Sequence, residues 1–174
     1  MKILYQGSPG AYSHLAALDV YPDAEIIPCK TFDECFFRAL EDEKLKIIIP
    51  ESNRTTGNIG IEYLIFKYRL NIYAEYFHGI EHNLLGIPGA KIKDIKNVLS
   101  HAQGLSQCSN YIKKNNLIEN VRADTAGSAE FISRNNKISE AAIASKLSAK
   151  IYKLDVIASN IENEKGNTTR FLIM

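Results

Sequence analysis

The chain ends in Asn167-Thr168-Thr169-Arg170-Phe171-Leu172-Ile173-Met174, a stretch that passes from polar to apolar within a few positions. Chain ends usually fray and carry polar residues that a fold can spare. Here the polar residues lead into a continuous apolar run, so we predict a buried strand over Thr169–Met174. Thr169 and Arg170 would stand where this strand enters its sheet. A hydroxyl beside a guanidinium suits the binding of a carboxylate and the delivery of a proton.

Short strand-forming runs alternate with helical periods along the rest of the chain. Residues 32–40 carry apolar side chains at i, i+3, i+4, i+7 and i+8, which predicts an amphipathic helix. Lys46–Pro50 contains three consecutive isoleucines, which suits a strand covered on both faces. Further strands are predicted at Lys2–Gln6, Asn71–Phe77, Asn97–Ser100 and Ala141–Ala144. Further helices are predicted around residues 11–18, 61–68, 105–112, 125–133 and 147–154, with Thr125 as the N-cap of the helix that it begins.

This alternation with short connections predicts an α/β protein with mainly parallel strands and flanking helices. The last strand would return to the sheet begun at Lys2, so that the middle of the chain forms a second lobe. We expect lobe 1 to comprise residues 1–76 and 159–174, and lobe 2 to comprise residues 77–158. Ligands of such sheets lie at the carboxyl ends of the strands, beside helix N-termini.

The composition excludes several classes of function. The 174 residues are 45% hydrophobic and 24% charged, as in a globular protein, and the net charge of +1 without a block of like charges offers no footprint for nucleic acid. No apolar run reaches the roughly 18–20 residues of a membrane span, and the apolar part of Met1–Tyr5 is too short for a signal peptide. Three cysteines without C-x-x-C spacing indicate reduced thiols. We expect a cytoplasmic protein that binds neither nucleic acid nor membranes.

Four predicted strand-to-helix junctions are rich in small and polar residues. They cover residues 7–13, 50–57, 100–108 and 124–129. Such junctions offer free backbone N–H groups and a favourable helix dipole, so they suit an anion. Because these four contain many Asn, Gln, Ser and Thr and few titratable groups, they favour an organic carboxylate as ligand over a metal or a nucleotide.

These junctions, in this order, resemble the catalytic domain of the prephenate dehydratase family over nearly the whole chain. The specific part is the Ser-His-x-Gln…Gln-Cys segment together with the Thr-Arg-Phe end. The matching segments are Gln6-Gly7…Gly10-Ala11-Tyr12-Ser13, Pro50…Asn53…Gly57, Asn83-Leu84-Leu85-Gly86, Ser100-His101…Gln103…Gln107-Cys108, Thr125-Ala126-Gly127…Ala129, Ala141-Ala142-Ile143-Ala144 and Asn167…Thr169-Arg170-Phe171.

The resemblance implies two lobes like those of a type II periplasmic binding protein, with an active-site cleft between them. It implies the decarboxylative dehydration of prephenate to phenylpyruvate in phenylalanine biosynthesis, without a cofactor or a metal. Such an enzyme holds a dianion, protonates the leaving hydroxyl and lets one carboxylate leave as CO2, mainly by orientation and electrostatic preorganisation. The resemblance also implies a homodimer or a higher homo-oligomer. The ACT domain that often follows in the family is absent from the chain, so we expect no feedback inhibition by phenylalanine.

The resemblance assigns catalytic roles to Thr169, Asn53, Gln107 and Arg170. Thr169 would donate to the departing hydroxyl, and Arg170 would bind a carboxylate in bidentate fashion or fix the strand of Thr169. Asn53 and Gln107 would place the ring and the hydroxyl, with His101 as a candidate for orienting Gln107. Backbone amides of Thr125, Ala126 and the Ser8–Ser13 turn would cradle a carboxylate. The expected substrate-binding residues are Tyr12, Ser13, Arg54, Ser100, His101, Gln103, Thr125, Ala126 and Thr168.

One segment departs from the family pattern Pro-Ile-Glu-Asn-Ser-x-x-Gly. The chain has Pro50-Glu51-Ser52-Asn53-Arg54-Thr55-Thr56-Gly57, which keeps the proline, the asparagine and the glycine in register. Ser52 replaces the carboxylate beside Asn53 and so removes an orienting partner. Arg54 adds a charge that would grip a substrate carboxylate or pair with Glu51.

Several alternatives stay open. Arogenate dehydratase and prephenate decarboxylases are sister enzymes on the same scaffold, and a non-catalytic carboxylate-binding module is a further possibility. Without the resemblance, Thr169 is a good strand former, Arg170 an ion-pair residue and Cys108 a buried small hydrophobe. His78-Gly79-Ile80-Glu81-His82 matches the H-x-x-E-H pattern of some zinc peptidases, but its flanks are typical of extended chain, so we expect no zinc site.

Overall fold

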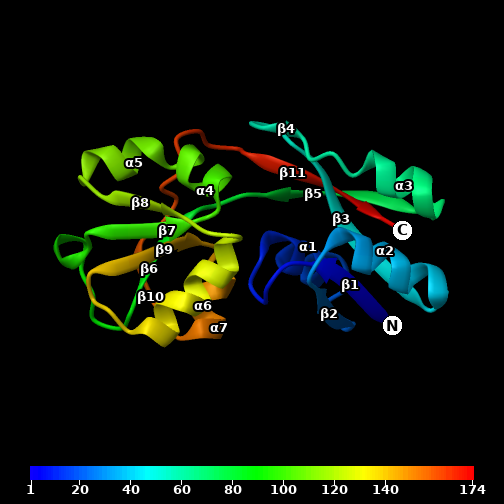
Figure 1. Cartoon of the computed structure of the whole chain (residues 1–174), viewed down its shortest axis with the longest axis horizontal. Coiled ribbons are helices and arrows are strands. Elements are labelled where there is room, and N and C mark those ends of the chain that lie inside the picture. The colour runs from blue at the N-terminus through cyan, green and yellow to red at the C-terminus, as the bar shows by residue number, and fades with distance from the viewer. The chain divides into compact units, whose positions relative to one another are not determined.

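The computed structural model describes all residues 1–174, which divide into two compact units. Unit 1 comprises Met1–Ser8, Tyr12–Ile80 and Gly166–Met174, and unit 2 comprises Pro9–Ala11 and Glu81–Lys165. Each unit has one sheet with flanking helices, so the α/β class is as predicted (Figure 1). No helix is both long enough and apolar enough to cross a lipid bilayer.

Unit 1 contains the first eight elements and the last strand. They are β1 (Lys2–Gln6), α1 (Tyr12–Val20), β2 (Glu25–Cys29), α2 (Phe32–Glu41), β3 (Leu45–Asn53), β4 (Gly57–Asn58), α3 (Glu62–Tyr68), β5 (Ala74–Gly79) and β11 (Thr168–Ile173). Unit 2 contains β6 (Asn83–Gly86), the 3-10 helix η1 (Ile92–Asp94), β7 (Asn97–Ser100), α4 (Ala102–Gln107), α5 (Ser109–Lys114), β8 (Ile118–Val121), α6 (Thr125–Asn135), β9 (Glu140–Ala144), α7 (Lys146–Tyr152) and β10 (Asp155–Ala158).

The unit boundaries differ from the lobes expected from the sequence. β5 pairs with β11 along its whole length, and the Ile80 N–H still donates to the Asn167 carbonyl at 2.8 Å, so unit 1 extends beyond residue 76. Residues 159–165 belong to unit 2, because the Ile161 N–H donates to the His82 carbonyl at 3.0 Å. Long-range hydrogen bonds of this kind leave no trace in local composition.

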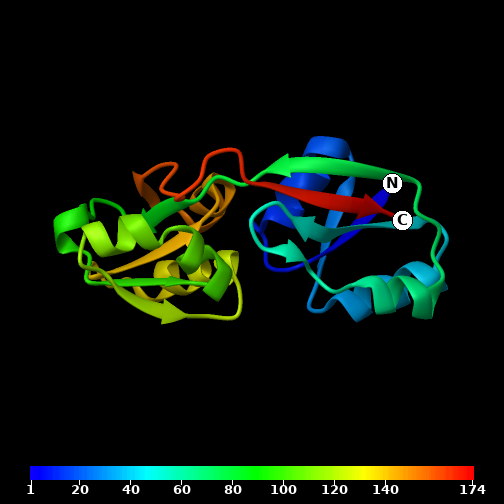
Figure 2. The same ribbon diagram turned by 90° about the horizontal axis from the view of Figure 1, so that it is seen from above.

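The sheet of unit 1 has the order β2-β1-β3-β11-β5, with β4 beside β3. β1 runs parallel to β2 and β3, but β11 runs antiparallel to both β3 and β5. Figure 2 shows β5 in green and β11 in red side by side with opposite directions. The prediction of mainly parallel strands is therefore wrong for half of this sheet, because the chain leaves unit 1 along β5 and returns along β11.

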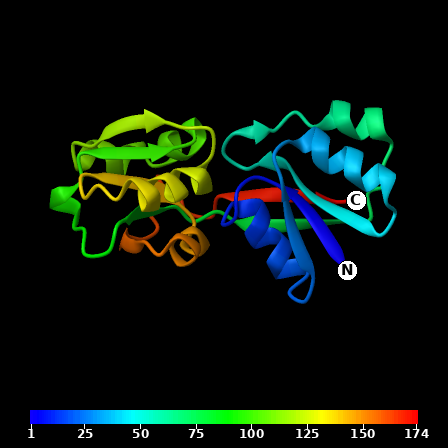
Figure 3. The ribbon, with the colours of Figure 1, turned by 60° about the horizontal axis from the view of Figure 1, so that its bottom comes forward.

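The sheet of unit 2 is mixed as well, with the order β10-β6-β9-β7-β8. β7 runs parallel to β8 and β9, whereas β6 runs antiparallel to β9 and β10. Figure 3 shows β7 between its two parallel neighbours. β9 is buried almost throughout because its small side chains, Ala141-Ala142-Ile143-Ala144, let helices approach both faces.

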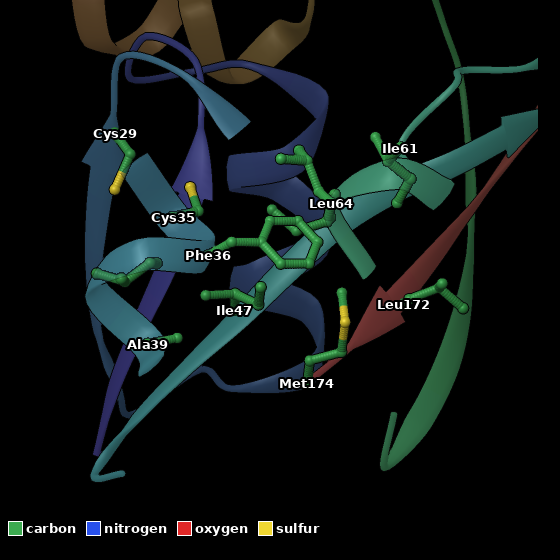
Figure 4. Packing of buried hydrophobic residues seen from close by; sticks show 11 residues of the cluster. Cys29, Cys35, Phe36, Ala39, Ile47, Ile61, Leu64, Leu172 and Met174 are labelled. Atoms are coloured by element: carbon green, nitrogen blue, oxygen red, sulfur yellow. The ribbon is translucent and has the colours of Figure 1, made fainter. Parts of the chain in front are cut away.

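The two faces of the unit 1 sheet bury different side chains. Leu172 and Met174 pack with Ile47 of β3, Phe36 of α2 and Leu64 of α3 in one core cluster (Figure 4). Because side chains alternate along a strand, Thr169, Phe171 and Ile173 point to the other face, which α1 covers. α2 begins where predicted because the Thr31 hydroxyl caps it, accepting from the Glu34 N–H at 3.1 Å.

The elements that sequence analysis missed are mostly edge strands. β2, β8 and β10 lie at sheet edges, where partial solvation removes the apolar alternation, and β8 is exposed throughout. β2 also contains Pro28, which suits an edge strand. The predicted helix over residues 105–112 is divided at Cys108 into α4 and α5.

Candidate active site

A β-bulge brings Asn53 and Thr169 together in unit 1. The pairing of β3 with β11 shifts between Arg170 and Phe171, so that Glu51 is the additional residue on β3. Ile47 and Ile49 point toward α2 and α3, and regular alternation would send Asn53 to that same face. The bulge reverses the alternation and pairs Asn53 with Thr169 on the opposite face.

The Asn53 amide has a fixed orientation. Its Oδ1 accepts from the Thr55 N–H at 3.0 Å, the Thr55 hydroxyl at 2.7 Å and the Thr56 hydroxyl at 3.3 Å. Its Nδ2 therefore faces Thr169 and donates to Oγ1 at 2.9 Å. Because one lone pair of Thr169 is filled in this way, its own O–H is directed elsewhere. Asn53 and Thr169 are 5% and 7% exposed, so the surroundings strengthen this polarised chain of hydrogen bonds.

Asn167 adds an unpartnered donor beside this group. The residue is 3% exposed, and its Nδ2 has no hydrogen-bond partner, while its Oδ1 accepts from the Thr55 hydroxyl at 3.5 Å. A buried amide without a partner costs free energy, so it is rare unless a water or a ligand satisfies it. The Thr168 hydroxyl, predicted as a substrate contact, donates to the Gly166 carbonyl at 3.3 Å.

Arg170 lies on the opposite face from Thr169. Its Nε donates to Glu75 at 2.7 Å and its Nη1 lies 3.4 Å from Glu51, so one guanidinium joins β5, β11 and β3. These neighbours raise the pKa of Arg170, first through the hydrogen bond to Glu75. Of the two roles expected for Arg170, this placement favours fixing the strand of Thr169. The guanidinium also lines a cavity of about 410 Å³, which extends along the face away from Thr169 to Ile72 and Tyr73.

Arg54 does not pair with Glu51, which corrects one of its two expected roles. Its Nη1 donates to the Gly166 carbonyl at 3.1 Å and closes the end of the β3–β11 ribbon. Glu51 instead accepts from the Ser52 hydroxyl at 2.6 Å and contacts Arg170. The bulge explains this choice, because it turns Glu51 toward the face of Arg170.

Gln107 in unit 2 is oriented by His82, not by His101. His82 Nε2 and Gln107 Oε1 lie 2.8 Å apart, and the His82 N–H donates to Glu162 at 2.9 Å. Burial lowers the pKa of His82, so the ring is neutral at neutral pH. An amide oxygen only accepts, so Nε2 carries the hydrogen and the NH2 group of Gln107 points away. His101 instead caps α4, where its Nδ1 accepts from the Gln103 N–H at 3.3 Å.

Gly104 allows several predicted site residues of unit 2 to meet. A Cβ at Gly104 would lie 2.8 Å from Ser100 Oγ, 3.5 Å from Thr125 Cγ2 and 3.7 Å from His82 Cε1. Ser100 is fully buried and its hydroxyl donates to the Ile143 carbonyl at 2.7 Å, so its proton serves the sheet. Thr125 and His82 therefore reach the same place as Gln107 because α4 has no side chain there.

The expected carboxylate cradle at Thr125 and Ala126 is already occupied. Asp124, not Thr125, is the N-cap of α6, and its Oδ1 accepts from the Gly127 N–H at 2.5 Å. An internal carboxylate thus takes the place at the helix N-terminus that a substrate carboxylate was expected to fill. Ala126 is fully buried.

The turn before α1 is divided between the two units. Pro9–Ala11 belongs to unit 2, where the Gly10 carbonyl accepts from the Ser145 hydroxyl at 2.6 Å and the Ser148 hydroxyl at 3.1 Å. Gly10 has φ +93°, and a Cβ there would lie 2.5 Å from Ser148 Oγ, so only glycine fits. Tyr12 and Ser13 form the first turn of α1 in unit 1, with Ser13 buried.

The cysteines and the H-x-x-E-H segment agree with their structural interpretations. Cys29, Cys35 and Cys108 are free and buried, and burial raises the pKa of the Cys108 thiol. His78 lies in β5 and His82 directly precedes β6, so both flanks of the segment are extended as predicted. Sequence analysis missed the role of His82 because the segment was weighed only as a metal motif. Its spacing from Gln107 carries no signal.

Comparisons with known proteins give one family. A family model described as prephenate dehydratase matches residues 3–174. A curated relative, "Arogenate dehydratase/prephenate dehydratase 1, chloroplastic" of Arabidopsis thaliana, is 45% identical over 178 residues, covering 100% of this chain and 45% of the relative. The chain thus spans less than half the length of the curated relatives that it matches.

Solved structures agree with this result. A structure titled "GqqA- a novel type of quorum quenching acylases" is 34% identical, with a TM-score of 0.91 over 99% of this chain and 63% of that one. Prephenate dehydratase from Arthrobacter aurescens, in complex with L-Phe, is 25% identical with a TM-score of 0.91 over 99% and 59%. A methionine-bound nutrient binding protein from Burkholderia cenocepacia, 10% identical with a TM-score of 0.52 over 100% of this chain and 84% of that one, shares the fold alone.

Proposed function

Because the chain belongs to the prephenate dehydratase family, we propose that it is a hydro-lyase that converts prephenate to phenylpyruvate, water and CO2. The observation that carries this proposal is the hydrogen-bond chain from Thr55 through Asn53 to Thr169. It fixes the direction in which the Thr169 hydroxyl donates, and a directed donor is what a departing hydroxyl needs.

Thr169 acts on the leaving oxygen. A free threonine is a very weak acid, so Thr169 hydrogen-bonds the departing hydroxyl and passes a proton as the carbon–oxygen bond breaks. The electron pair of the breaking carbon–carboxylate bond enters the ring, which becomes aromatic as CO2 leaves. Donation from Asn53 to Thr169 Oγ1 polarises the O–H bond toward the substrate. Donors that are already in place cost no reorganisation during the reaction.

The remaining polar groups bind the dianion. Arg54 is exposed and uses Nη1 on the Gly166 carbonyl, so its other N–H groups can meet a carboxylate. The unpartnered Nδ2 of Asn167 supports an oxygen ligand close to Thr55. Gln107, oriented by His82, donates from unit 2. We retain Tyr12, Ser13, His101, Gln103, Thr125 and Thr168 as further substrate-binding residues.

Arogenate is the second candidate substrate, because curated relatives that are 45% and 40% identical carry arogenate dehydratase in their names. Arogenate has an amino group where prephenate has a keto group, so the same elimination gives phenylalanine. The leaving hydroxyl and the departing carboxylate are common to both. The Thr169 group therefore serves either substrate, and the choice between them rests on contacts to the side chain.

The test follows the purified chain with each substrate in turn. We expect phenylpyruvate from prephenate or phenylalanine from arogenate, at rates above the non-enzymatic ones at neutral pH. The ratio of the two kcat/KM values assigns the substrate. Tight binding of both without turnover would overturn the proposal in favour of a carboxylate-binding module. Hydrolysis of an N-acyl homoserine lactone, with neither dehydration, would overturn it in favour of an acylase.

We also propose that the chain acts in the cytoplasm as a homodimer, as expected from the family resemblance. Light scattering coupled to size exclusion tests the second part. A mass near twice 19.5 kDa is expected, and a single-chain mass at assay concentration would contradict it.

A further inference from the structure

Thr169 has a second neighbour on its own face of the sheet. In the register of unit 1 it pairs with Asn53 of β3 on one side and with His78 of β5 on the other. Paired residues of antiparallel strands point to the same face, with Cβ atoms about 4.5–5.5 Å apart. Asn53, Thr169 and His78 therefore form a row across three adjacent strands, and Figure 2 shows the two outer ones of this row's ribbon, β11 and β5, side by side.

His78 is held by a carboxylate. Its Nδ1 lies 2.9 Å from Asp19 Oδ2 of α1, and the imidazole side chain is 14% exposed. The Tyr76 hydroxyl donates to the same oxygen at 3.1 Å, and burial with the hydrogen bond to Asp19 raises the pKa of Tyr76, which stays a donor. Because a carboxylate oxygen accepts, His78 Nδ1 carries a hydrogen. The ring then exchanges its second proton at Nε2.

The proposed reaction needs such a group. The hydroxyl of the substrate leaves as water, which takes up one proton, and threonine is too weak an acid to supply it without replacement. A threonine hydroxyl has one hydrogen to donate and two lone pairs to accept with. Asn53 Nδ2 fills one lone pair at 2.9 Å. The other can accept from a donor on the far side of β11, which is where His78 stands.

We infer that His78, held by Asp19, is a positioning residue that replaces the proton of Thr169, an inference that rests on the proposed function. The Thr169 proton moves to the departing oxygen as the carbon–oxygen bond breaks and water forms. The Nε2 proton of His78 moves to Thr169 Oγ1, directly or through one water. The imidazole is left neutral and regains a proton from solvent, so no oxidant or reductant is needed.

The charged groups around His78 set the expected pH dependence. Asp19 faces it from α1 and Tyr76 from β5, whereas Thr169 on β11 is uncharged. Glu51, Glu75 and Arg170 lie on the opposite face of the sheet. An imidazolium beside one carboxylate loses its proton as the pH rises, within the range of about 5 to 8 or just above it. The reaction step should therefore slow as the pH rises.

The experiment compares pH profiles of kcat for the full chain, with whichever substrate the wild type converts. In wild type, kcat should fall on the alkaline side. His78→Gln should lower kcat about 10- to 100-fold, leave KM within a few-fold and abolish the alkaline fall. Added imidazole should restore part of the rate of His78→Gly. Phe77→Gln introduces the same side chain on the same strand at an exposed position of the other face, and should leave the wild-type profile unchanged.

A second variant keeps the inference testable if His78→Gln does not fold. Asp19→Asn leaves the imidazole in place but removes the charge that stabilises its protonated form, so the alkaline fall should move to lower pH. A wild-type kcat and profile in His78→Gln, or in Asp19→Asn where that variant is used, would overturn the inference while the dehydratase proposal stands. A wild type that converts neither substrate would overturn both.

Discussion

Thr169 receives a hydrogen bond from Asn53 at 2.9 Å, and the Asn53 oxygen is occupied by Thr55 and Thr56. At the scale of single residues, the direction of one proton therefore depends on an amide that cannot turn over. The same holds in unit 2, where His82 fixes the Gln107 amide at 2.8 Å. Replacing either orienting residue should cost activity without removing a group that reacts.

Asn53→Asp tests the first of these amides. The substitution keeps the shape of the side chain, but it removes the donor to Thr169 and adds a negative charge near a dianionic substrate. We expect kcat to fall about 10²-fold and KM to rise. Steady-state kinetics of a folded variant measure both. Asn120→Asp on exposed β8 adds the same charge elsewhere and should change neither value, and a mutant of wild-type kcat at position 53 would refute the orienting role.

His82 makes stability depend on pH. Burial lowers its pKa below the ordinary value of 6.5, and burial lowers that of His14 in the same direction. The unfolded chain therefore binds these protons more readily, so the stability is fully present above pH 6.5 and is lost as the pH falls below it. Urea unfolding between about pH 7.5 and 5 should show this loss, at up to about 1.4 kcal/mol per pH unit for each histidine. His82→Gln should reduce the slope, and an unchanged slope would contradict the assignment.

At the scale of elements, the bulge in β3 and the glycine in α4 do what no single side chain does. The bulge turns Asn53 to the face of Thr169, and Gly104 admits Ser100, Thr125 and His82 to one place. Neither feature has a signal in the sequence. A bulge depends on the register between two strands, and the space beside a helical glycine depends on which elements pack there.

Gly104→Ala tests the second element. Alanine in place of glycine usually stabilises a helix, but here its Cβ would lie 2.8 Å from the buried Ser100 Oγ, which is bonded to the Ile143 carbonyl. We expect a loss of about 1–3 kcal/mol in the free energy of unfolding, as for other overpacked sites. Urea denaturation measures it. Gly79→Ala, where a Cβ meets nothing within 4 Å, is the control, and a stabilised Gly104→Ala would contradict the packing described.

Deleting the last six residues tests the strand from which the sequence was read. β11 lies between β3 and β5, and Phe171, Leu172, Ile173 and Met174 are all buried. Without them the sheet of unit 1 loses its link between these strands and part of its core. We expect loss of cooperative unfolding for unit 1 by circular dichroism and loss of all turnover. A truncated chain with wild-type melting would show that β11 is dispensable.

At the scale of the whole molecule, local pattern predicted the α/β class, the central strands and most helices, because buried strands such as β3 and amphipathic helices such as α2 carry strong periodic signals. Partner choice was not predictable. Arg170 was expected beside the substrate and pairs with Glu75, and Thr125 was expected as a cap where Asp124 serves. Thr169 and Asn53 were both predicted, but the contact that joins them comes from the fold.

The measurement that tests the central claim most directly is kcat for Thr169→Val and Thr169→Ser, with prephenate and with arogenate. Valine keeps the shape and removes the hydroxyl, whereas serine keeps the hydroxyl. We predict that Thr169→Val folds, binds substrate with a KM within a few-fold of wild type and loses about 10²- to 10⁴-fold in kcat, while Thr169→Ser stays within about tenfold. A Thr169→Val protein that turns over substrate at the wild-type rate would contradict the role of this hydroxyl.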